Sequence, residues 1–288
     1  YSWKMGRELG GGRKVYVLAD FVFFPYSPRT PRYTFGNSSG ASAYTDRTGA
    51  IQRAVLELVE RDSFMICWLN GLSMPIFAHR SLPESAQRRI QALSKAGFSV
   101  VVKDFTLDMA PVIMVFAQSD KISYTTCAGC ASFDVLDALD HALMEVEAAV
   151  FCRLRDGRPG KIKAYSVRQT GDHGKLYSDQ RFYKKADEVI WRGRREHFSN
   201  AGGQSTWDKL LSEVDHNGSR VVVVDLESTV EKHLKVVKAF IPGLVPMSFG
   251  FGNEPLGMER IYSLPVTMGL LRKARSFQQL NKFPHPYT

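Results

Sequence analysis

The sequence predicts an α+β fold in which mixed sheets pack against long helices. Two observations carry this prediction. Residues 46–69 and 134–155 have apolar side chains at helical spacing over a long distance, and three β-branched stretches lie between them, at 98–103, 112–117 and 122–126. No pattern recurs at a fixed period, and helices and strands do not alternate regularly. Both facts favour α+β over a doubly wound array of β-α-β units.

The other elements follow from shorter patterns. Pro83–Ala96 has the spacing of an amphipathic helix, and Asp134 is placed to cap the helix that follows it. We expect loops where proline and glycine gather, at Pro25–Asn37 and Gly243–Gly257, and a long polar excursion at Asp156–Ser205. The remaining expected elements are strands at Lys14–Phe24, Arg220–Leu226 and Leu234–Phe240, and helices at Lys184–Arg192 and Thr206–Val214.

The composition is that of an ordinary globular chain. It has 288 residues, 44% hydrophobic and 23% charged, enough for a sizeable core in one large domain or two small ones. No apolar run approaches the roughly 18 residues that a membrane helix needs, and the first residues lack the apolar segment of a signal peptide. The net charge of +9 favours an anionic partner: a nucleotide, an acidic peptide or a nucleic acid.

The four cysteines are too few for a disulfide framework in a chain of this length, so we expect a reducing, cytoplasmic location. Cys127 and Cys130 have the spacing of a metal or redox pair, but no second pair stands at zinc-finger distance. The alternative is two small buried residues. The glycines at 10–12 precede a strand rather than a helix, which excludes a Walker phosphate loop.

The stretch Phe35–Asp62 joins a turn rich in glycine and serine to a strong helix. Three charged residues interrupt the apolar helix. Glu57 and Glu60 are three residues apart and share a face, while Glu57 and Arg61 are four apart and can pair. Two carboxylates on one face repel each other unless a cation lies between them. The pattern fits either a metal or catalytic pair or a solvated helix edge with an ion pair.

This stretch, SSGASA followed by AVLELVERD, resembles the nucleotide-binding signature of the YcaO family. ALDHALME at 138–145 is similar to the second acidic helix of that family. Further matches follow in order: GDHGKLY (171–177), VVVVDL (221–226), IPGLVPMSFGFG (241–252), PLGMER (255–260) and FPHPYT (283–288). Together they cover nearly the whole chain. The branch that it resembles most is that of the azoline-forming cyclodehydratases of ribosomally made peptides.

The resemblance implies a single YcaO-like, ATP-dependent catalytic domain over residues 1–288, which can be the C-terminal part of a longer chain. It also implies that carboxylates on the two acidic helices grip the phosphates of ATP through Mg²⁺. Glu57, Glu60 and Glu145 are therefore the expected metal ligands. An ordinary turn before a helix is the alternative for Ser39 and Gly40. The expected nucleotide-binding residues are Ser39, Gly40, Glu57, Glu60, Arg61, His141, Glu145 and Glu147.

One position departs from the family pattern. Asp137, His141, Glu145 and Ala148 recur at helical spacing, so they share one side of their helix. Related enzymes usually have Gln three residues after the helix Glu, where this chain has Ala148. Either Glu147 replaces that Gln through a local shift of the helix, or one nucleotide contact is missing.

The end FPHPYT resembles the proline-rich C-terminus of the family, which implies an extended arm returning to the active site. Pro284 and Pro286 fit this pattern, and Thr288 stands where a third proline would be expected. His285 would be the acid/base group there, and a plain loop histidine is the alternative. These four residues are the expected catalytic residues. The tail has no helix or strand pattern, so we expect the core not to depend on it.

The implied reaction converts Cys, Ser or Thr residues of a precursor peptide to azolines, through phosphorylation of the backbone amide oxygen by ATP. The alternatives are thioamide or amidine formation, a weakly catalytic peptide-binding scaffold, which Ala148 suggests, and nucleic-acid binding, which only the charge supports. Because no segment resembles an E1-like, leader-binding domain, we expect a separate partner protein of that kind. We expect no nucleic acid and no membrane partner, and a homodimer stays open.

Overall fold

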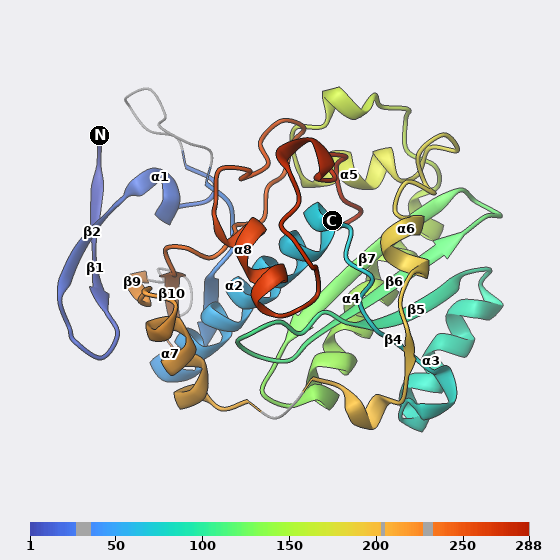
Figure 1. The fold of residues 1–288 in the computed structure, drawn as a ribbon. Helices are drawn as coiled ribbons and strands as arrows, with labels where there is room; N and C mark the ends of the chain where they lie inside the picture. Colours follow the sequence, from blue (N-terminus) through green and yellow to red (C-terminus); the bar gives the residue numbers. More distant parts are fainter. Residues whose placement is uncertain (27–35, 203–204, 227–232, 288) are drawn as a thin grey trace. The chain divides into compact units, whose positions relative to one another are not determined.

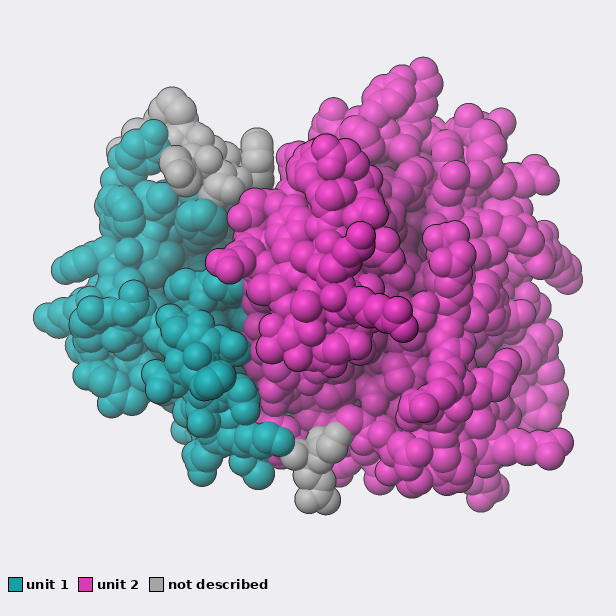
Figure 2. Space-filling view, in the orientation of Figure 1, with its two compact units in different colours: residues 1–61, 206–244 teal, residues 62–205, 245–288 magenta. Residues whose placement is uncertain are grey.

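A computed structural model describes residues 1–26, 36–202, 205–226 and 233–287 of the chain. The chain divides into two compact units. Unit 1 comprises Tyr1–Arg61 and Thr206–Leu244, and unit 2 comprises Asp62–Ser205 and Val245–Thr288 (Figure 2). The long helix α2 (Arg47–Asn70) contributes to both, because the division falls at residue 61. None of the described helices is both long and apolar enough to cross a membrane.

Unit 1 is built on a five-stranded antiparallel sheet (Figure 1). Its strand order is β2-β1-β9-β10-β3. The strands are β1 (Trp3–Glu8), β2 (Lys14–Leu18), β3 (Ala41–Tyr44), β9 (Val222–Leu226) and β10 (Lys235–Phe240), and the helices besides α2 are α1 (Ala19–Val22) and α7 (Trp207–His216). The predicted strands at 220–226 and 234–240 and the helix at 206–214 are confirmed. The strand β1 was not predicted.

The prediction of a strand over Lys14–Phe24 is wrong in its second half. Pairing with β1 ends at Trp3 and Leu18, so the chain beyond Leu18 has no strand to continue beside and turns into α1. The glycines at 10–12 form the turn of the β1–β2 hairpin, where the Glu8 N–H donates to the Arg13 carbonyl at 2.9 Å. This position confirms that they do not form a Walker loop.

Unit 2 is built on a second five-stranded sheet, in the order β7-β6-β5-β4-β8. Its strands are β4 (Ile76–Phe77), β5 (Ser99–Asp104), β6 (Val112–Ser119), β7 (Tyr124–Ala131) and β8 (Arg195–Glu196). The pairs from β7 to β4 are antiparallel, and β4 and β8 are parallel. All eight residues of β6 are buried, so the structure of this unit covers both faces of the sheet. The three strands predicted between the long helices are confirmed, with β7 longer than expected.

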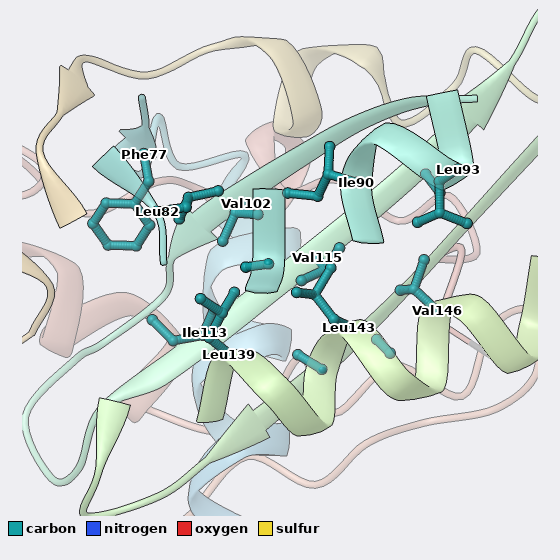
Figure 3. Packing of buried hydrophobic residues seen from close by; sticks show 14 of the residues in the cluster. Phe77, Leu82, Ile90, Leu93, Val102, Ile113, Val115, Leu139, Leu143 and Val146 are labelled. Carbon is teal, nitrogen blue, oxygen red and sulfur yellow. The ribbon is translucent and has the colours of Figure 1, made fainter. Parts of the chain in front are cut away.

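Two helices cover one face of this sheet. They are α3 (Glu84–Lys95) and α4 (Val135–Asp156), and both were predicted. Asp134 caps α4 as expected, because its side chain accepts a hydrogen bond from the Leu136 N–H. Figure 3 shows the apolar cluster between α3, α4 and the strands, in which Ile113, Val115 and Leu143 interdigitate.

The polar excursion at Asp156–Ser205 holds more structure than the sequence indicated. It contains α5 (Thr170–Leu176), α6 (Asp187–Trp191) and short 3-10 turns at Ala164–Ser166 and Phe198–Asn200. The helix predicted at 184–192 corresponds to α6, whereas α5 was not predicted. After the glycine-rich loop comes α8 (Arg260–Thr267), also not predicted. Of the predicted loop at Pro25–Asn37, residues 27–35 lie outside the described residues.

Candidate functional site

A tight turn precedes the acidic helix in unit 1. The Ser39 N–H donates to the Asn37 side chain at 2.9 Å, and the chain then passes through Gly40 with φ +76°. A Cβ atom at residue 40 would lie 2.6 Å from the Ala239 carbonyl oxygen of β10. Both the left-handed backbone and this close approach require glycine.

This turn is bound to α2 through two charged side chains. One Glu57 carboxylate oxygen accepts from the Gly40 N–H at 2.8 Å, and the other pairs with Arg61 at 2.6 Å. Arg61 also donates to the Ser39 hydroxyl at 2.9 Å. The side chains of Arg61 and Glu57 are only 14% and 24% exposed. The structure therefore brings four of the predicted nucleotide-binding residues together, in a mostly buried group rather than on a solvated helix edge.

Lys238 belongs to the same group and was missed in the sequence. It lies in β10, is 2% exposed, and donates to the Asn37 carbonyl at 2.7 Å. Burial lowers the pKa of Lys238 to about 8, while the charge of Glu57 opposes that shift and that of Arg61 adds to it. A lysine inside the apolar strand sequence VVKAF was the available signal, because a buried amine needs a partner or a function.

Glu60 lies one turn along α2 from Glu57 and is 8% exposed. Within the described residues, no three His, Cys, Asp or Glu side chains gather closely enough to hold a metal ion by themselves. Mg²⁺, however, commonly binds through one or two carboxylates and completes its shell with substrate phosphates and water. Two carboxylates one helical turn apart, beside the Arg61 guanidinium, fit a magnesium–nucleotide complex better than a cage made of protein alone.

The second acidic helix belongs to unit 2. His141 and Glu145 are both exposed, one turn apart on α4, and the ring of His141 hydrogen-bonds the Asp137 carbonyl at 2.9 Å. Glu147 is engaged elsewhere, because Arg89 of α3 donates to both of its carboxylate oxygens at 2.8 Å. Successive helical residues point about 100° apart, so Glu147 faces α3 while Ala148 faces away. The structure shows no local shift that would turn Glu147 toward the side of Glu145.

Cys127 and Cys130 both lie within β7, Cys127 buried and Cys130 half-buried, and neither forms a disulfide. Residues three apart in a strand point to opposite faces of the sheet. The two sulfur atoms therefore cannot share one metal ion or form a redox pair, in agreement with the alternative of two small packed residues.

The C-terminal tail is embedded in unit 2. Pro284, His285, Pro286 and Tyr287 are all buried, and Tyr287 forms a parallel bridge with Cys127 at the edge of β7. A segment without its own secondary structure is thus held by side-chain contacts that no local pattern reveals, which argues against the expectation that the core does not depend on the tail. Thr288 lies outside the described residues.

His285 is 2% exposed, and its Nε2 atom lies 2.9 Å from the Ser248 carbonyl. Its ring stacks on that of His173 in α5, with centroids 4.4 Å apart, and meets Phe64 of α2 edge-on at 5.3 Å. His173 is 1% exposed, and burial lowers its pKa below the usual range. The predicted acid/base residue is thus enclosed by aromatic rings and is not open to solvent.

Sequence comparison identifies one family. The model described as YcaO cyclodehydratase, ATP- and Mg²⁺-binding, matches residues 1–245. An uncharacterized protein of Methanothermobacter thermautotrophicus is 22% identical over 251 residues, which cover 84% of this chain and 65% of that relative.

Solved structures resemble the chain in fold. A heterocyclase in complex with substrate and cofactor aligns with a TM-score of 0.79 and 21% identity, over 99% of this chain and 38% of its own. YcaO from Methanopyrus kandleri, bound with AMPPCP and Mg²⁺, aligns with a TM-score of 0.68 and 19% identity. The alignment covers 84% of this chain and 64% of that protein. The E. coli microcin synthetase McbBCD complex with pro-MccB17 bound aligns with a TM-score of 0.60 and 13% identity. The alignment covers 86% of this chain and 64% of the aligned chain of that complex. The chain thus spans less than two thirds of the length of each of these relatives.

Proposed function

The chain belongs to the YcaO family, and from this premise we propose that it supplies the catalytic centre of an ATP- and Mg²⁺-dependent cyclodehydratase acting on a ribosomally made precursor peptide. The observation that carries the proposal is the group of Ser39, Gly40, Glu57 and Arg61, joined by three contacts of 2.6–2.9 Å. The Arg61 guanidinium can face phosphate oxygens, and Glu57, with Glu60 one helical turn along α2, supplies carboxylates of the kind that bind magnesium beside a triphosphate.

The proposed reaction removes one water from the peptide. The thiol or hydroxyl of a Cys, Ser or Thr residue loses its proton and adds to the preceding backbone carbonyl carbon, and the carbonyl oxygen accepts the γ-phosphoryl group of ATP, so that ADP leaves. Loss of the amide proton and departure of phosphate then form the C=N bond of the azoline. The amide oxygen is a poor leaving group, and phosphorylation makes it a good one.

The residues divide these tasks between them in the proposal. Arg61 places its planar guanidinium against phosphate oxygens, with Ser39 orienting it through the 2.9 Å hydrogen bond. Glu57, Glu60 and Glu145 would hold Mg²⁺, which neutralises charge on the transferring phosphoryl group. Pro284, Pro286 and Thr288 are proposed to carry the tail to the reacting amide, with His285 as the acid/base group.

A precursor peptide and a separate leader-binding partner complete the proposal. Their support is the fold shared with a heterocyclase solved in complex with substrate and with a microcin synthetase complex solved with pro-MccB17 bound. Ala148 favours a second candidate, a weakly catalytic, peptide-binding relative, because Glu147 is bound by Arg89 and is turned away from the side of Glu145.

Paired assays test the proposal. We expect ATP hydrolysis that rises when a Cys- or Ser-containing precursor peptide and the partner protein are added, with loss of one water per ring detected by mass spectrometry. Glu57→Gln, Glu60→Gln and Glu145→Gln should each abolish Mg²⁺-dependent turnover. Glu84→Gln is the control, because this carboxylate is 81% exposed on α3. Full turnover in all three variants would exclude the metal assignment, and hydrolysis without ring formation would favour the second candidate.

A further inference from the structure

Three consecutive backbone carbonyls of the tail each accept a hydrogen bond from a different buried side chain. The Trp68 indole N–H donates to the Phe283 carbonyl at 2.9 Å, and the Tyr177 hydroxyl donates to the Pro284 carbonyl at 2.8 Å. The His173 ring donates through Nδ1 to the His285 carbonyl at 2.7 Å. Trp68, Tyr177 and His173 are at most 1% exposed. They come from three places in unit 2: α2, the residue after α5, and α5 itself.

The chemistry of the tail explains why side chains hold it. Residues 284 and 286 are proline and lack an N–H, so this segment cannot form the regular ladder of a strand. Its carbonyl oxygens remain available, and three donors are aimed at them. A buried donor that loses its acceptor bears the full cost of its desolvation, so Trp68, Tyr177 and His173 each need the tail in this place.

The contacts also orient the imidazole of His285, the histidine of this segment. His173 bonds the backbone of His285 and stacks on its ring, while the Ser248 carbonyl bonds the His285 Nε2 atom. Phe249 meets both imidazole rings edge-on, with centroids 5.7 Å away. Backbone and side chain of His285 are thus held from independent directions.

We infer that Trp68, Tyr177 and His173 form a clamp that positions the C-terminal tail for ring formation. The inference deepens the proposed function and rests on it. The three are positioning residues: they act through the tail and not on the peptide. Weakening the clamp should therefore lower the rate of ring formation while leaving nucleotide affinity unchanged, because the nucleotide group of unit 1 is held by its own contacts between Ser39, Gly40, Glu57 and Arg61.

Tyr177→Phe is the sharpest variant, because it removes one hydroxyl and keeps the ring. Tyr262→Phe is its matched control: that hydroxyl also donates to a backbone carbonyl, that of Leu256 at 2.7 Å, and not to a carbonyl of the tail. Hydrogen exchange of the tail amides, followed by mass spectrometry, reports the clamp without any assay of activity. We expect exchange about two- to tenfold faster in Tyr177→Phe, the factor that one hydrogen bond supplies, and unchanged exchange in Tyr262→Phe.

Kinetics then connect the clamp to catalysis. We expect Tyr177→Phe to lower kcat for ring formation by a similar factor, with the KM for ATP unchanged. His173→Asn keeps an N–H donor near the position of Nδ1, whereas His173→Leu removes it. The Asn variant should therefore retain more ring formation than the Leu variant, which a purely space-filling role would not produce.

The outcomes separate the clamp from the proposed function. Unchanged tail exchange in Tyr177→Phe overturns the clamp. Faster exchange with unchanged kcat overturns its role in positioning. If the wild-type protein forms no rings with any peptide and partner, the proposed function fails and the catalytic role of the clamp fails with it, while tail exchange still decides whether these side chains hold the tail.

Discussion

Lys103 has no exposed surface, yet it carries an amine into the core of unit 2. It donates to the Arg192 carbonyl at 2.6 Å and also to the Val189 carbonyl, both at the end of α6. Burial lowers the pKa of Lys103 from 10.5 to about 8, and the Cys67 thiol opposes this shift slightly. Between pH 8 and 10.5 the Lys103 amine is protonated in the unfolded chain but not in the folded one. This group therefore makes the free energy of unfolding rise with pH.

A comparison of pH profiles tests this buried amine. The contribution of Lys103 is present above pH 10.5 and is lost as the pH falls toward 8, a difference of about 3 kcal/mol. The free energy of unfolding, measured with denaturant, should therefore rise less between pH 8 and 10.5 for Lys103→Met than for wild type. Lys95→Met, at the exposed end of α3, is the control. Parallel profiles for wild type and Lys103→Met would show that this amine does not titrate as its burial implies.

Ala148 offers no hydrogen bond where the family usually offers an amide. It is exposed on α4, and Glu147 cannot replace it while bound to Arg89. Ala148→Gln should lower the dissociation constant of ATP by about two- to tenfold, because one hydrogen bond is gained. Calorimetry measures this dissociation constant. Leu154→Gln, near the end of the same helix, is the control. Unchanged or weaker ATP binding in Ala148→Gln would mean that this site does not reach the nucleotide.

At the residue scale, spacing in the sequence predicted contacts between side chains of the same helix. The Glu57–Arg61 pair is four residues apart in sequence and is present in the structure. Lys238 reaches the same group only because β10 pairs with β3, and sheet pairing is not encoded in local spacing. His173 meets His285 across 112 residues. Residues brought together by tertiary contacts of this kind needed the structure.

At the scale of elements, Arg260 joins three segments of unit 2. It donates to Asp62 of α2 and to Asp108 of the loop after β5, from the first residue of α8. Asp62 is 1% exposed, and its carboxylate also accepts from the Val245 N–H at 2.7 Å. Burial would lower the pKa of Arg260, but its bonds to Asp108 and Asp62 raise it above the ordinary value. Burial raises the pKa of Asp62, and Arg260 partly opposes this.

Removal of this arginine should be severe. Arg260→Met leaves two carboxylates without their cation, one of them deeply buried, and should destabilise unit 2 by about 3–5 kcal/mol. Arg192→Met is the matched control, because its ion pair with Glu188 is exposed and is worth at most about 1 kcal/mol. Equal midpoints of urea unfolding for the two variants would show that the Arg260 network does not join the three segments.

The sequence predicted elements best where their pattern is long or strongly apolar, as in α2, α4, β6 and β10. It missed β1, whose residues WKMGRE include three charged side chains and a glycine, because pairing with β2 and β9 stabilises that strand. It also missed α8, where Pro265 lies inside the helix and lowers its local propensity. In both places tertiary packing overrides local propensity.

At the scale of the whole chain, α2 carries residues of both groups on which the proposed reaction depends: the nucleotide group and the side chains beside the tail. It carries Glu57 and Arg61 in the nucleotide group of unit 1, and Phe64 and Trp68 beside the tail in unit 2. Residues of this one helix thus belong to both groups. The tail, in turn, contacts residues of α2, α5 and β7.

This dependence predicts what loss of the tail does. Deleting residues 283–288 leaves the donors of Trp68, Tyr177 and His173 buried without acceptors, at about 1–3 kcal/mol each. We expect the truncated protein to be destabilised by several kcal/mol in urea unfolding. A synthetic peptide of sequence FPHPYT should restore stability and ring formation when added in trans, while a scrambled peptide should not. Truncation without loss of stability would show that the fold does not depend on the tail. Rescue by the scrambled peptide would show that the clamp does not recognise the positions of the two prolines.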